Sequence, residues 1–444
     1  MKKNFKALIQ ILQKDWVFIA ILTAILLAYS ISTYLDLVLI TLLSLLLLAN
    51  IKNNKLFYTY FALIFFEPIM VVPLVGGTYF RVFYLLLALR VLIDIIEKRK
   101  VKKDIPTIII GVIFFVTSFL YSINIGRNIS VVMNVLSVLY ISLSLKSQDD
   151  FKESIGKLLT FIAIFSALSG LFGLIRGFIM EGIISGRFYG TIDDPNYSAL
   201  FYIIGFFATF GASLIKKTWV KIAIATLLVL FIFATASITA LLVIALLSFI
   251  WFIVKFGFKK SLLLVLVGVV LICAILFIPF SNGSYIDVTQ NKLQKFLVFE
   301  DPNSYLRYQY PNYSDFEMYL NRITSNRYYL AKTYAIHLFV NTPLSQQFFG
   351  GNNPVEGDFI KSIPVMNEKV SHNSYIDMMF MIGYVFTLLV LIFIGVNIIK
   401  YFLRYLRTKD NEYVCIVLIM LSVLLFSTAI SIFPYRYFIA FLLL

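Results

Sequence analysis

The chain contains few of the residues on which soluble enzymes and metal proteins depend. Of its 444 residues, two are cysteine, two are histidine and 14% are charged. Cys273 and Cys415 lie inside apolar runs without a CxxC pattern, which excludes a disulfide framework and a cysteine-based zinc site. Soluble domains carry roughly 25% charged residues, so the low charge excludes that class as well.

Apolar residues are abundant in this chain. They make up 60% of the chain, and the mean hydropathy is +0.90. Because a helix needs roughly 17–25 apolar residues to cross a bilayer, the sequence predicts an all-α polytopic membrane protein with about 12–14 transmembrane helices. The expected spans are residues 16–35, 37–50, 56–75, 80–96, 105–123, 129–145, 158–177, 196–215, 220–235, 238–254, 261–280, 373–399 and 413–433.

Basic residues gather in alternate gaps between these spans. The positive-inside rule places such gaps in the cytoplasm, so we expect a cytoplasmic N-terminus. The net charge of +15 then reflects topology and contact with anionic membrane lipid. Nucleic acid is a poor alternative partner because the basic residues are scattered over many loops. The basic gaps are residues 2–14, 52–55, 98–103, 146–157, 216–221, 255–260 and 400–409.

One gap, residues 281–372, is long and largely polar, and the alternation places it outside the cytoplasm. Loops of this length usually have a function. Ser325 or Asn326 is expected to cap a helix that runs to about Val340 and is stopped by Pro343. We treat residues 1–444 as one transmembrane domain and residues 281–372 as an extracytoplasmic loop that bears part of a site.

The same alternation places Arg187, Arg327 and His372 on the outer side, where they can share one site. His372 stands where the long loop enters a span, and its imidazole can take and return a proton near neutral pH. Asp194 suits the N-cap and Pro195 the first position of the following helix. The positive end of that helix and its N–H groups would then face Arg187, which predicts an anion-binding corner.

Simpler interpretations exist for the same outer-face residues. Arg187 can be an interfacial arginine that extends toward the lipid headgroups, and Arg327 can be merely solvated, as can Arg322. Asp193 and Asp194 can form a metal-binding pair, but Pro195 favours a cap and turn. We predict no metal and no cofactor.

Three further residues have their own interpretations. His337 lies near the apolar side of the loop helix, where a packed or interfacial role is favoured. Arg90 lies deep in a span, where an unpaired charge is costly, and we interpret it as structural with Glu67 as an available partner. Arg81, nearer the outer end of the same span, is a plausible extra contact for an anion.

Three segments carry a shared pattern: Gly186–Thr191 with Pro195 and Asn196, Arg327–Ala331 with Pro343, Gly350 and Gly351, and Ser371–Tyr375 with Gly383. Taken in order with the long loop, they resemble the O-antigen ligase and Wzy-type polysaccharide polymerase superfamily of bacterial membrane proteins. The similarity covers roughly the second half of the chain. One departure is Ser237, which is followed by Ile238 where many relatives carry arginine; Arg322 is a candidate replacement.

The resemblance implies a reaction and a site. Members of the superfamily transfer a glycan from undecaprenyl diphosphate to an acceptor hydroxyl at the outer face of the bacterial cytoplasmic membrane, without a metal or a nucleotide sugar. On this basis His372 is the expected general base. Arg187 and Arg327 are expected to bind the diphosphate. The supporting residues are Arg322 and Arg81 at the diphosphate, and Asn373 and Asn196.

The expected function is therefore a polysaccharide polymerase that acts on an undecaprenyl-diphosphate-linked oligosaccharide. A chain-length regulator and a flippase of the same pathway are the protein partners considered. Two alternatives stay open. The same site can ligate finished polysaccharide to another acceptor, and a flippase for lipid-linked oligosaccharide is the alternative from a different class. A flippase is expected to line its cavity with charge, and these spans carry little.

Overall fold

The computed structural model describes most of the chain. In the N-terminal part of the chain, the described residues are 2–31, 36–66, 71–72, 77–97, 99, 104–121 and 125–176. It continues with residues 187–191, 194–262, 314–324, 327–351, 373–430 and 438–443. The chain divides into two compact units. One comprises residues 1–104, 137–235 and 401–419, and the other residues 105–136, 236–400 and 420–444.

The first unit is helical, with one short pair of strands. The two-residue strands β1 (Val71–Val72) and β2 (Gly77–Thr78) are antiparallel, with Val71 opposite Thr78. The N-terminal helices are α1 (Lys2–Leu12), α2 (Asp15–Ile31), α3 (Asp36–Ala49), α4 (Lys55–Ile64) and α5 (Tyr79–Ile96). The later ones are α8 (Phe151–Arg176), α9 (Pro195–Gly211) and α10 (Thr218–Ala234), while α7 (Ile125–Lys146) and α20 (Asn411–Phe426) each contribute one end.

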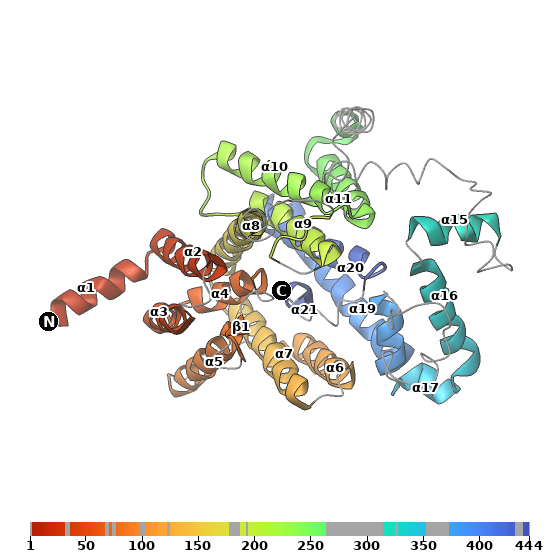
Figure 1. The fold of residues 1–444 in the computed structure, drawn as a ribbon, viewed down its shortest axis with the longest axis horizontal. Coiled ribbons are helices and arrows are strands. Elements are labelled where there is room, and N and C mark those ends of the chain that lie inside the picture. Colours follow the sequence, from red (N-terminus) through yellow and green to blue (C-terminus); the bar gives the residue numbers. More distant parts are fainter. Residues whose placement is uncertain are drawn as a thin grey trace. The chain divides into compact units, whose positions relative to one another are not determined.

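Helices α4, α8, α9 and α10 lie next to one another (Figure 1), and the core of this unit among them is aromatic. Phe65 packs edge-on against Phe201 with ring centroids 5.1 Å apart, and Phe66 meets Phe172 at 5.4 Å. All four rings are buried. Large rings of this kind bury more apolar surface than other side chains and prefer edge-to-face packing, so they fix the helices that surround the Arg187 loop.

The second unit contains the described part of the long loop. Its helices are α6 (Ile105–Tyr121), α11 (Ile238–Phe256), α15 (Asp315–Ile323), α16 (Arg327–Ile336), the π-helical turn η4 (His337–Asn341), α17 (Leu344–Phe349), most of α19 (Ser374–Thr408) and α21 (Phe438–Leu443). The expected loop helix is present as α16 and η4, and η4 ends two residues before Pro343, as expected from the missing proline N–H. Ser325 and Asn326 lie outside the described residues.

Among the described residues, three helices are long and apolar enough to cross a membrane. They are Phe151–Ile175, Ile238–Phe256 and Ser374–Thr408, and a fourth is gained if Lys6–Leu12 and Asp15–Ala28, bent by 78°, form one span. This finding supports a mostly helical membrane protein. Other expected spans coincide with helices that are shorter or whose fully described part is shorter, and 261–280 lies almost wholly outside the described residues. Helix α4 ends at Ile64, well short of the expected 75, before Pro68 interrupts the sequence.

Candidate functional site

Arg187 is the best-defined basic residue of the expected site. Its Nε donates to the carbonyl oxygen of Thr235 at 2.9 Å, just after α10, and its Nη2 donates to Oδ1 of Asn196 at 3.0 Å, in the first turn of α9. The guanidinium is partly buried. Two directional hydrogen bonds from one planar group fix its orientation, so Asn196 acts as a positioning residue for Arg187.

The loop that carries Arg187 is tightly anchored on both sides. The N–H of Phe188 donates to Ala234 O at 2.9 Å, and the Phe188 ring stacks on Phe231 with centroids 5.3 Å apart. Gly190 has a φ of +61°, and a Cβ there would lie 2.0 Å from the hydroxyl of Tyr202. Only glycine fits that position, which explains the second glycine of the Gly-Arg-Phe-Tyr-Gly motif.

Asp194 caps α9 as the sequence predicts. Its carboxylate accepts the backbone N–H groups of Asn196 at 2.7 Å and Tyr197 at 3.2 Å, and Pro195 occupies the first helical position. We expected these N–H groups to face an anion, but the Asp194 carboxylate occupies them. The helix end therefore offers less to an anion than we expected, and the positive charge of the expected site would come from Arg187. Asp193 lies outside the described residues.

Arg81 lies in the first turn of α5, in the same unit as Arg187, with an exposed side chain. Exposure is compatible with either a solvated arginine or an anion contact. Arg90, on the same helix, is buried and donates from Nε to Asp94 Oδ2 at 2.8 Å and from Nη1 to Ile51 O at 2.6 Å. These contacts support the structural interpretation, with Asp94 as the partner that sequence reasoning missed; Glu67 lies outside the described residues.

Asn373 immediately precedes α19 in the second unit. Its Oδ1 accepts the N–H groups of Tyr375 at 3.0 Å and Ile376 at 3.2 Å, and its Nδ2 donates to Thr428 O at 3.2 Å. Asparagine is among the best helix N-caps, so Asn373 fixes where the span starts. His372, the expected base, precedes this cap and lies outside the described residues.

Arg327 is the first residue of α16, partly buried, and its N–H donates to Thr324 O at 3.3 Å. Arg322 belongs to α15, although the structure does not describe its side chain. Helix α15 was not expected. The buried Asn321 joins it to α16 by accepting the N–H of Tyr329 at 3.0 Å. The two arginines therefore sit on a helix pair whose junction is fixed by hydrogen bonds.

Glu317 adds charge to this junction. Its carboxylate accepts from Lys332 Nζ at 2.6 Å and from the Tyr328 hydroxyl at 3.1 Å. The Lys332 hydrogen bond, followed by one from the Ser314 backbone N–H, lowers the pKa of Glu317 to about 2. The carboxylate is therefore ionised at every physiological pH. A capping box of Ser314 and Glu317 is the sequence signal that would have located α15.

His337 packs as expected. Its ring stacks on Phe380 of α19, with centroids 6.1 Å apart and planes 7° from parallel, beside the buried Tyr334. Burial lowers the pKa of His337. Lowering favours the neutral ring, which suits a packed histidine. The π-helical turn that begins at His337 was not expected, since a π-helix has no simple sequence signature.

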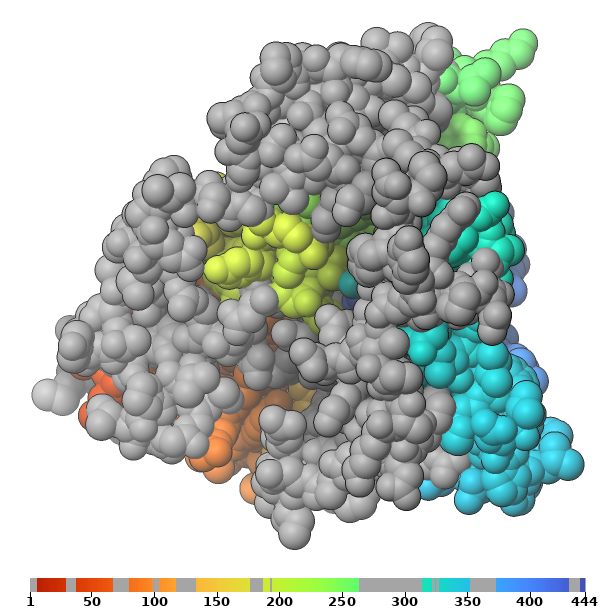
Figure 2. All heavy atoms as spheres, turned by 45° about the vertical axis from the view of Figure 1, so that its right-hand side comes forward, coloured from red at the N-terminus to blue at the C-terminus, as the bar shows by residue number. Residues whose placement is uncertain are grey.

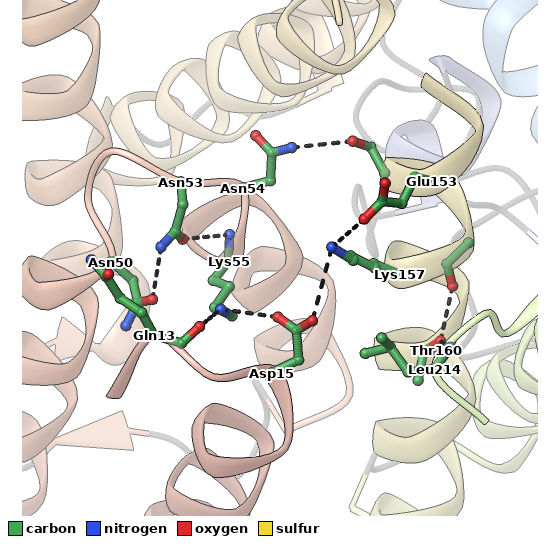
Figure 3. Close-up of polar contacts among 12 residues, drawn as sticks. Gln13, Asp15, Asn50, Asn53, Asn54, Lys55, Glu153, Lys157, Thr160 and Leu214 are labelled. Carbon is green, nitrogen blue, oxygen red and sulfur yellow. Dashed lines mark hydrogen bonds and ion pairs between the residues drawn. The ribbon is translucent and has the colours of Figure 1, made fainter. Parts of the chain in front are cut away.

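A cluster of charged side chains lies in the first unit, at the predicted cytoplasmic ends of its helices (Figure 3). The sequence did not predict it. Its members are Asp15, Lys55, Glu153 and Lys157. The Asp15 carboxylate lies 2.9 Å from the Nζ of the buried Lys55 and 3.9 Å from the Nζ of Lys157, which also pairs with Glu153 at 2.6 Å. These contacts join the turn between α1 and α2 to α4 and α8. A near-buried lysine needs such partners, so the cluster is structural.

Comparison with protein-family models finds none that matches the chain, and comparison with curated proteins finds no match either. The family resemblance therefore depends on the sequence motifs around Arg187, Arg327 and His372. Each motif lies at a helix start: Arg187 precedes α9, Arg327 opens α16, and His372 precedes α19.

Proposed function

We propose that the chain is a membrane glycosyltransferase of the bacterial cell envelope. It transfers a growing glycan from undecaprenyl diphosphate to a hydroxyl of a lipid-linked repeat unit at the outer face of the cytoplasmic membrane. Its fold would be of the O-antigen ligase type, with about 12–14 spans. The observation that supports this most is Arg187, which Thr235 and Asn196 hold beside the start of α9.

The proposed reaction is a displacement at the anomeric carbon of the donor. His372 takes the proton of the acceptor hydroxyl while that oxygen forms the new glycosidic bond. The bond between the anomeric carbon and the diphosphate oxygen breaks, and undecaprenyl diphosphate leaves with the electron pair. Arg187 and Arg327 stabilise the charge that develops on the diphosphate, the work that preorganised cations perform in transfer reactions.

The test uses the full chain in proteoliposomes with a lipid-linked repeat unit as substrate. We expect His372→Ala to lower the transfer rate by roughly 10²–10⁴-fold, the contribution of one proton-transfer group. His337→Phe is the matched control, since a phenyl ring preserves the stacking on Phe380. A normal rate in His372→Ala would refute the assignment. Transfer of finished polysaccharide to a different acceptor, without chain growth, would identify a ligase.

A further inference from the structure

The loop between the expected spans carries a row of exposed apolar side chains that glycan transfer does not use. Val340 is 73% exposed, Leu344 70% and Phe349 65%. Ile336, Phe339 and Phe348 are exposed as well. Figure 2 shows α17, in cyan, at the surface. Contiguous exposed apolar surface of this kind marks a contact with another molecule or with a membrane.

The opposite side of the same segment is packed. Tyr334 and Leu338 are fully buried and form one cluster with Phe380 of α19. Ile336, Phe339 and Val340 are three and four residues apart, the spacing of a single helix face. The segment is therefore amphipathic, with one face on α19 and the apolar row on another. Residues 336–349 contain no aspartate, glutamate, lysine or arginine.

The end of the apolar row is fixed to α19 by backbone contacts. The N–H of Gly351 donates to Met381 O at 2.9 Å. A Cβ on Gly350 would lie 2.3 Å from Met381 O, and a Cβ on Gly383 would lie 2.2 Å from Phe348 O. Such close approach needs glycine on both sides. The end of α17 is thus held at the kink of α19.

The row continues directly into the exposed surface of α19. Phe339 stacks on Tyr384 with centroids 5.6 Å apart, and Phe348 meets the same ring edge-on at 6.1 Å. Beyond Tyr384, α19 exposes Val385, Leu388 and Leu389. Because α19 is long and apolar enough to cross a membrane, a bilayer around it would cover these side chains with hydrocarbon. Lipid that covers them also reaches the row.

We propose that residues 336–349 are inserted into the boundary between lipid headgroups and acyl chains, with the apolar row turned to the hydrocarbon. Phenylalanine and leucine are side chains that interfacial segments bury at this boundary, and the absence of charged residues means that insertion desolvates no charge. The molecule that covers the apolar row is therefore lipid of the bilayer. The attachment of the segment to α19 sets the depth at which the segment lies in the bilayer. The proposal goes beyond glycan transfer and holds whether or not the chain catalyses it.

The test places a fluorescent nitrobenzoxadiazole label on single cysteines in the full chain, in phosphatidylcholine vesicles, with Cys273 and Cys415 replaced by alanine. Val340→Cys and Phe349→Cys probe the row. Asp315→Cys, an exposed charged position on α15, is the matched control. We expect spin-labelled lipid to quench the row labels at least about threefold more than the control, and aqueous iodide to show the reverse order.

Equal quenching by iodide at the row and at residue 315 would overturn the proposal, because it would show that the row lies in water and not in the bilayer. If Phe349→Cys fails to fold, Leu344→Cys supplies the second position, since Leu344 is equally exposed. The readout does not involve glycan transfer. A catalytically inactive chain with lipid-quenched labels would refute the proposed function alone.

Discussion

The kink of α19 provides the sharpest stability prediction. Gly383 has φ 73° and ψ 178°, a conformation inside the helix that is essentially restricted to glycine. A Cβ at this position would also lie 2.2 Å from Phe348 O, which belongs to the backbone of α17 and cannot rotate away. Gly383→Ala therefore meets two separate penalties, one conformational and one steric.

The two penalties set the expected magnitude. A residue forced into a sparsely populated backbone region costs about 1–3 kcal/mol, and overpacking of a tight contact costs a further 1–3 kcal/mol or so. Gly383→Ala should therefore destabilise the protein by roughly 2–6 kcal/mol. At about 2–4 °C per kcal/mol for a domain of 150–250 residues, Tm should fall by at least ~4 °C.

The assay is thermal unfolding of the purified full chain in detergent, followed by size-exclusion chromatography of heated samples. Gly395→Ala is the matched control, because Gly395 lies further along α19 and a Cβ there has nothing within 4 Å. Alanine is the better helix former, so the control should keep or raise Tm. If Gly383→Ala and Gly395→Ala melt together, the contact between α17 and α19 does not exist as described.

Three further predictions follow from the site. Asp194→Ala should lower Tm through a loss of about 1 kcal/mol of capping energy, whereas Asp194→Asn, which keeps an acceptor, should not. Arg187→Lys should slow glycan transfer on the order of tenfold for each guanidinium hydrogen bond lost; an unchanged rate would count against the diphosphate role. Because the pKa of Glu317 is lowered to about 2, its carboxylate still pairs with Lys332 at about pH 4 and stabilises α15 and α16. Pepsin should therefore cut these helices more slowly at that pH than in Glu317→Gln. The difference should vanish as pH falls through about 2, where Glu317 is protonated.

The local elements of the fold were predictable wherever one short-range signal dominates. Asp194 and Pro195 identify the start of α9 because a cap and a proline act within one turn. Pro343 likewise marks where the loop helix stops. The position of most helices follows from apolar runs, since the bilayer sets the length that hydrophobic segments need.

Contacts between distant segments were not predictable. Asp94 pairs with Arg90 within one helix, but the pair is completed by Tyr140 of α7, which accompanies no sequence motif. The capping role of Asn373 was also not predicted, although asparagine before an apolar run is a recognised N-cap signal. The kink at Gly383 depends on the backbone of α17, a partner that no local pattern reveals.

The Asp15 carboxylate is shared by two lysines that are synthesised at different times, so its ion pairs form in a fixed order. Lys55 leaves the ribosome soon after Asp15, whereas Lys157 follows on the order of ten seconds later at ~5–20 residues per second. Asp15 can therefore pair with Lys55 while synthesis continues, and only the arrival of α8 completes the cluster. The turn between α1 and α2 thus keeps only part of its polar contacts until α8 has been synthesised.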